Sequence, residues 1–110
     1  MGWALGWPLP LKETAERARR CGLAKKSWSD KRAREEVMME IVRWPDSRLI
    51  QFVACEVDNR IVCTVALCVD EDAETAEEAK PNNLPPLKVA YRIIDLLDTD
   101  RDLQWYKDFD

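Results

Sequence analysis

Two neighbouring stretches in the middle of the chain are dense in β-branched and apolar residues. They are Leu49–Val57 and Arg60–Val69, and only Asp58-Asn59 separates them. A two-residue Asp-Asn connection between such stretches is typical of a tight β-hairpin. The sequence therefore predicts an antiparallel pair of strands. The expected partners across it are Val57 with Arg60, Ala54 with Cys63, and Phe52 with Val65.

This register gives the hairpin one apolar face and one mixed face. The apolar face collects Ile50, Phe52, Ala54, Ile61, Cys63, Val65, Leu67 and Val69. The mixed face holds Leu49, Gln51, Val53, Cys55, Arg60, Val62, Thr64, Ala66 and Cys68. We expect the first face to be core, because a slip of one residue would exchange the two faces. The second face then needs a cover, which another element or a second copy of the chain, as a homodimer, would supply.

Helical spacing of apolar residues predicts helices on both sides of the hairpin. The first covers residues 11–21, with Gly22 just after it, where a left-handed residue is usual. The second begins at Ser29 or Asp30 and ends at Arg43, because Trp44-Pro45 follows. After the hairpin, residues 87–97 are apolar around most of the helix, so we expect this helix to be the most buried. Residues 70–80 allow a short peripheral helix.

The two ends of the chain are expected to pack on this core. Residues 1–10 read as an extended arm, and Trp3, Leu5 and Trp7 would be costly to leave in water. Residues 101–109 form a short final element. We therefore predict one α+β domain over residues 1–110: a small antiparallel hairpin or sheet packed against two N-terminal helices and one or two C-terminal helices. Because two strands alone are marginal, the arm or a second copy should add a strand.

The residue inventory argues against an enzyme. The chain has no histidine to act as a general base and only three glycines, too few for a phosphate-binding loop. The four cysteines show no C-x-x-C spacing, so we expect reduced thiols, no metal and no cofactor. Reduced thiols, the lack of a signal peptide and the lack of a long apolar run together predict a cytoplasmic protein that does not enter a membrane.

One motif resembles part of a calcium-binding loop. Asp98, Asp100 and Asp102 match the first three ligand positions of an EF-hand. Leu103 stands where that loop needs glycine, and Phe109 where it needs glutamate. The sequence therefore predicts no calcium site here.

Charge is distributed unevenly along the chain. Residues 1–47 carry ten basic and seven acidic residues, whereas residues 48–110 carry seven basic and fourteen acidic ones. A basic segment flanks the first helical connection and loosely resembles a helix-turn-helix. Its candidate nucleic-acid-binding residues are Arg17, Arg19, Arg20, Lys25, Lys26, Lys31 and Arg32. A small nucleic-acid-binding regulator is therefore our alternative function.

The leading hypothesis places the function at the acidic C-terminal side. Its candidate partner-binding residues are Asp98, Asp100, Asp102, Trp105 and Tyr106. Aromatic anchors inside an acidic rim suit docking onto a basic protein surface, such as that of a nucleic-acid-binding machine. We therefore expect a non-enzymatic binding module or inhibitor. The classes that fit are accessory proteins of phages or mobile elements, of anti-CRISPR or anti-restriction type, and toxin-immunity proteins.

Overall fold

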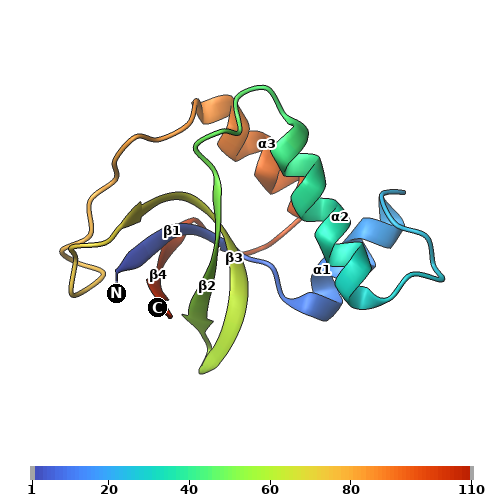
Figure 1. Ribbon diagram of the computed structural model, residues 1–110, viewed down its shortest axis with the longest axis horizontal. Helices are drawn as coiled ribbons and strands as arrows, with labels where there is room; N and C mark the ends of the chain where they lie inside the picture. The colour runs from blue at the N-terminus through green and yellow to red at the C-terminus, as the bar shows by residue number, and fades with distance from the viewer. Residues whose placement is uncertain (1, 110) are drawn as a thin grey trace.

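The computed structural model describes residues 2–109, and its strands form a small closed antiparallel barrel (Figure 1). Around the barrel the order is β1 (Trp3–Pro8), β3 (Arg60–Asp70), β2 (Gln51–Val57) and β4 (Gln104–Asp108), and β4 returns to β1. The α+β class is therefore confirmed. The predicted hairpin is half of a closed barrel, and the closure itself was not predicted.

The central hairpin has the predicted register. Val57 pairs with Arg60, Ala54 with Cys63, and Phe52 with Val65. The turn residues Asp58 and Asn59 both have positive φ, at 51° and 65°. Two successive left-handed residues match the right-handed twist of paired strands, and Asp and Asn tolerate that conformation better than most residues. This local turn chemistry sets the register of the whole pair.

The mixed face of the hairpin is the inside of the barrel. Cys55 and Ala66 are fully buried there, together with Ala4 of β1 and Tyr106 of β4. The chain's own first and last strands thus supply the cover that we had assigned to another element or a second copy. Part of the mixed face, which we had considered as a homodimer interface, is therefore already covered by strands of the same chain.

The apolar face of the hairpin packs against the helices. Val65 and Leu67 of β3 contact a core cluster that includes Trp7, Val37 and Ile93. The helices that supply this cluster are α1 (Leu11–Arg20), α2 (Asp30–Arg43) and α3 (Leu87–Leu97). All three lie on one side of the barrel (Figure 1). None of the helices within residues 2–109 has the length and apolar character needed to cross a bilayer.

The predicted helix boundaries agree with the structure. Ser29 caps α2 by accepting a hydrogen bond from the backbone N–H of Arg32 at 3.2 Å. Trp44 ends α2 in an extended conformation, as expected for a residue before proline. Gly22 follows α1 with a φ of 82°. The inner positions of α2 that we predicted, Ala33, Val37, Ile41 and Trp44, are all buried.

The two terminal segments are both strands. Most of the predicted arm is β1, which confirms that the arm adds a strand, while Met1 lies outside the described residues. The final element contains β4, so of the one or two C-terminal helices that we predicted the described residues contain one, α3. The side chains of β4 alternate, since Tyr106 points into the barrel while the next residue, Lys107, is exposed. Residues 70–80 form turns with no helix, closed by Asp70, whose carboxylate accepts from the backbone N–H groups of Asp72 and Lys80 at 3.1 and 3.0 Å.

The pairing of β1 with β3 depends on a glycine. The register shifts between Leu5 and Gly6, where β1 passes very close to β3. A side chain at Gly6 would overlap the carbonyl oxygen of Val65 and would place its Cβ 2.9 Å from the Cα of Ala66. Because both obstacles are backbone, neither can move aside without opening the barrel.

We expect Gly6→Ala to lower the free energy of unfolding by about 3 kcal/mol, because the added methyl group forces β1 away from β3. The matched control is Gly22→Ala, where no atom lies within 4 Å and only the positive φ opposes the change, at about 1 kcal/mol. Urea unfolding followed by tryptophan fluorescence measures both. Equal losses of stability for the two variants would contradict the close approach of β1 to β3.

Candidate functional site

Helix α3 carries apolar side chains on two opposite sides. Val89 and Ile93 are buried against the core. On the other side Leu87, Tyr91 and Ile94 are 68%, 61% and 38% exposed. Their spacing of four and then three residues aligns them along one face of the helix, which we call the α3 stripe. The prediction that this helix is the most buried is therefore wrong, because only one of its sides contacts the core.

The basic residues of α3 are engaged with the end of α2. Lys88 forms an ion pair with Asp46, with 2.8 Å between Nζ and Oδ2. The guanidinium of Arg92 lies over the ring of Trp44, 4.4 Å from its centroid. These contacts fix α3 beside α2 and partly satisfy its positive charges.

The acidic residues predicted to bind a partner follow directly after the α3 stripe. Asp98 ends α3 in a left-handed conformation, with φ at 49°. Asp98, Asp100 and Asp102 are all exposed, and we call these three residues the acidic loop. Asp98 therefore sits at the end of the helix that carries the α3 stripe, an apolar surface that we had not expected, while Asp98 and Asp100 also line a cleft against α1.

The two predicted aromatic anchors, Trp105 and Tyr106, lie in strand β4 of the barrel. Tyr106 is only 7% exposed, and its hydroxyl accepts a hydrogen bond from Gln104 Nε2 at 2.6 Å. Trp105 is half-buried. Tyr91 of α3 is a more exposed aromatic side chain, at 61%, and the sequence analysis missed it as a candidate. The apolar spacing of residues 87, 91 and 94 was the signal that could have found it.

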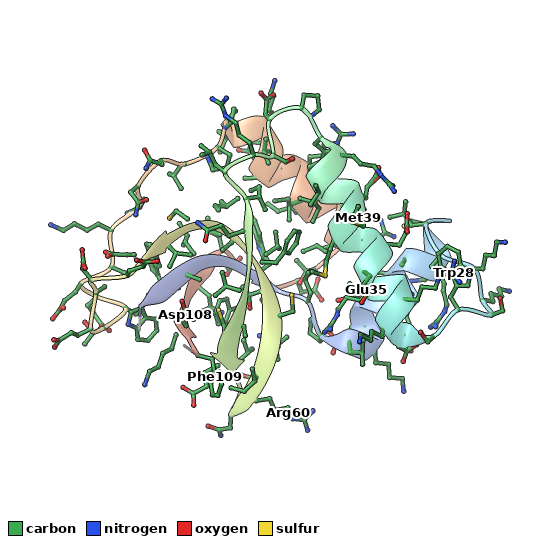
Figure 2. The ribbon with its side chains drawn as sticks, in the orientation of Figure 1. Trp28, Glu35, Met39, Arg60, Asp108 and Phe109 are labelled. Carbon is green, nitrogen blue, oxygen red and sulfur yellow. The ribbon has the colours of Figure 1, made fainter. Side chains whose placement is uncertain are left out.

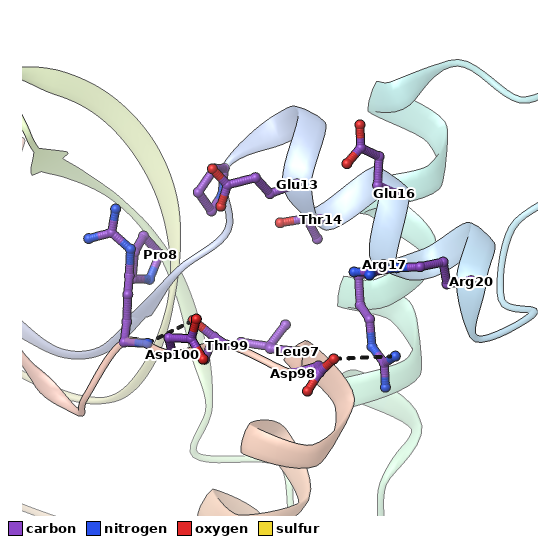
Figure 3. Close-up of a pocket in the computed structure, with 12 residues that line it drawn as sticks. Pro8, Glu13, Thr14, Glu16, Arg17, Arg20, Leu97, Asp98, Thr99 and Asp100 are labelled. Atoms are coloured by element: carbon purple, nitrogen blue, oxygen red, sulfur yellow. Dashed lines mark hydrogen bonds and ion pairs between the residues drawn. The ribbon is translucent and has the colours of Figure 1, made fainter.

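A charged cleft of about 290 Å³ lies between α1 and residues 97–101 (Figure 3). Its wall carries both signs of charge, from Glu13, Glu16, Arg17, Arg20, Asp98, Asp100 and Arg101. Figure 3 shows Arg17 reaching Asp98, with 3.9 Å between the charged atoms. Within residues 2–109, no three His, Cys, Asp or Glu side chains are grouped so that they could hold a metal ion. The cleft thus presents charges of both signs.

The buried thiols are poor nucleophiles. Burial raises the pKa of the Cys55 thiol, although a hydrogen bond with Thr64 opposes this shift. Burial also raises the pKa of Cys63, and the nearby Arg34 opposes it. Because the thiolate is the reactive form, both groups are held mainly as unreactive thiols at neutral pH. The four cysteines are free, and Cys21 is the exposed one.

Two of the predicted nucleic-acid-binding residues have structural partners. Arg17 donates from Nε to the carbonyl oxygen of Leu96 at 2.9 Å, and also to that of Asp95 at 3.2 Å. It therefore binds the free carbonyl groups at the C-terminal end of α3. Arg19 donates to the carbonyl oxygen of Trp28 at 2.7 Å and to the carboxylate of Asp30 at 2.8 Å. Arg17 thus holds α1 against α3, and Arg19 holds the connection between α1 and α2 in place.

The other predicted basic residues are exposed around the connection between α1 and α2. They are Arg20, Lys25, Lys26, Lys31 and Arg32, and we call them the basic tip. The guanidinium of Arg32 stacks 3.9 Å from the centroid of the Trp28 ring. Figure 2 shows Trp28 at the end of the molecule, away from the barrel. Among residues 2–109, the other four side chains of the tip form no hydrogen bond or ion pair.

Comparisons with protein-family models, with curated proteins and with solved structures give no match for this chain.

We expect Arg17→Ala to lower the free energy of unfolding by about 1.5 kcal/mol, because it removes charged hydrogen bonds that join α1 to α3. The control, Arg20→Ala, removes the same charge from an exposed site and should cost less than about 0.5 kcal/mol. Urea unfolding of both variants measures the difference. Equal stability of the two variants would show that Arg17 is not a structural link.

Proposed function

We propose that this protein acts by binding another protein, without a catalytic step of its own, and that the α3 stripe and the acidic loop form the docking surface. The observation that carries this proposal is the exposure of Leu87, Tyr91 and Ile94 on one helix face. An aligned apolar group beside polar residues is typical of protein-binding sites, where a few large side chains supply most of the binding energy.

The arrangement favours a helix-in-groove mode of binding. The α3 stripe has the spacing of the anchors that an amphipathic helix inserts into an apolar groove. Leu84, which is 48% exposed and precedes α3, extends the apolar surface at the other end. Because α3 is already folded against the core, binding would not require the helix to be ordered first.

The charge next to the stripe favours a basic partner. The acidic loop contributes three exposed carboxylates after α3, of which Asp98 is paired with Arg17 while Asp100 and Asp102 remain available to a partner. The positive charges of Lys88 and Arg92 are engaged with Asp46 and Trp44. A partner with an apolar groove bordered by Lys or Arg would therefore match this surface, and the charges would speed the encounter.

This surface is consistent with an inhibitor or adaptor of a nucleic-acid-binding machine. Proteins that handle nucleic acids carry the basic surfaces that an acidic loop can dock against. Accessory proteins of phages or mobile elements, and toxin-immunity proteins, act by this kind of docking. The four free thiols support a reducing compartment such as the cytoplasm.

The test uses a double variant in which Leu87 and Tyr91 are both replaced by Asp. It is compared with a matched control on α2. The control is Met39→Asp with Val42→Asp, whose native side chains are 46% and 54% exposed (Figure 2 labels Met39). A partner is isolated from the source cells with the native protein and purified. Its dissociation constant is then measured by calorimetry. We expect the α3 variant to bind at least about 100-fold more weakly, and the control to bind like the native protein.

Two outcomes would contradict the proposal. One is a result in which both variants lose binding equally, or in which neither variant loses binding. The other is a native homodimer, detected by light scattering, that the α3 variant converts to a monomer, because a second copy would then occupy the stripe. Urea unfolding of each variant shows that its fold is intact.

A further inference from the structure

The basic tip is a second surface that the proposed protein docking does not use. Residues 20–32 carry five basic residues and one acidic residue, a net charge of +4, although the whole chain carries −4. The single acid, Asp30, is paired with Arg19, which lies in α1 outside the tip. The exposed charge of residues 20–32 is therefore positive, and the acids near the tip are those that line the cleft with Arg20, namely Glu16, Asp98 and Asp100.

The acidic part of the sequence after β3 lies far from this tip. Residues 70–78 contain six acidic residues: Asp70, Glu71, Asp72, Glu74, Glu77 and Glu78. Figure 1 shows this segment at one end of the long axis and the α1–α2 connection at the other, and the molecule extends 42 Å along that axis. At physiological salt the screening length is only about 8 Å. The acidic segment therefore does not cancel the attraction of the tip for an anion.

The tip offers little apolar surface to a protein partner, because its one aromatic side chain, Trp28, is half-buried and covered by Arg32. Its apolar residues Leu23 and Ala24 are half-buried and pack toward the core. Arg32 stacks on the ring of Trp28. Protein interfaces usually need exposed aromatic or aliphatic anchors. Binding to a phosphate backbone, in contrast, needs only cations and other hydrogen-bond donors.

We propose that the basic tip binds the phosphate backbone of a nucleic acid. Arg20, Lys25, Lys26 and Lys31 would contact phosphates, and Arg32 would do so from its position over Trp28. The contacts carry no base recognition, so binding should depend on salt and hardly on sequence. Arg17 and Arg19 contribute indirectly, because they hold α1 and the connection in position.

The number of phosphate contacts can be measured from the salt dependence of the binding constant. Displacing about five phosphate counterions gives a slope of about −4.5 for the logarithm of the binding constant against the logarithm of salt concentration. The protein is titrated against a short labelled DNA duplex by fluorescence anisotropy, between about 50 mM and about 200 mM salt. The native protein should show a slope between about −4 and about −4.5.

The decisive variant is Lys25→Ala with Lys26→Ala. It should make the slope less steep by about 2 and weaken binding at the lowest salt at least about 10-fold. The control, Lys80→Ala with Lys107→Ala, changes the net charge equally at exposed positions outside the tip. It should leave the slope unchanged. The α3 variant Leu87→Asp with Tyr91→Asp should also bind the duplex like the native protein, so the two proposals can fail separately.

Three results would overturn the proposal. The first is no binding to the duplex at the lowest salt. The second is an equal loss of binding in the Lys25/Lys26 variant and in the Lys80/Lys107 control. The third is competition by polyglutamate as strong as that by unlabelled duplex, because the tip would then attract an acidic polypeptide as readily as a nucleic acid. Urea unfolding of the variants confirms that each remains folded.

Discussion

The middle of β3 is buried on both of its faces, and the rest of the structure depends on covering both. Each of the five residues from Thr64 to Cys68 is at most 5% exposed. One face needs the barrel to close over Ala66, which β1 and β4 accomplish. The other face needs helices over Val65 and Leu67, which α2 and α3 provide. Gly6 is necessary for the first of these arrangements, because only glycine lets β1 approach β3 so closely.

The same constraint creates the surfaces that we assign to binding. A helix that covers one face of a small barrel uses only one of its sides, so the other apolar side of α3 remains exposed as the stripe. Arg17 joins the end of α3 to α1 and pairs with Asp98, the first residue of the acidic loop. Arg19 and Asp30 fix the connection that presents the basic tip. Structural arginines thus position both surfaces without forming part of either.

Features with local causes could be predicted from the sequence, and features that depend on distant pairing could not. The Asp58-Asn59 turn sets the hairpin register, and Ser29 and Trp44-Pro45 set the limits of α2. The strand β4 was missed because its partners lie about a hundred residues away, as with Leu5 and Trp105. Periodicity showed that α3 is apolar on two sides but could not show which side faces the core. The basic segment was found, yet the role of Arg17 depends on Leu96, 79 residues further along the chain.

The central claim is that β1 and β4 are integral to one barrel, which is the scaffold for both binding surfaces. Native-state hydrogen exchange, followed residue by residue by NMR, tests it most directly. We expect the paired amides of β1 and β4 to open with the same free energy as those of β3, close to the free energy of global unfolding. Exchange of the β1 and β4 amides through a low-energy local opening, while β2 and β3 stay protected, would contradict the account.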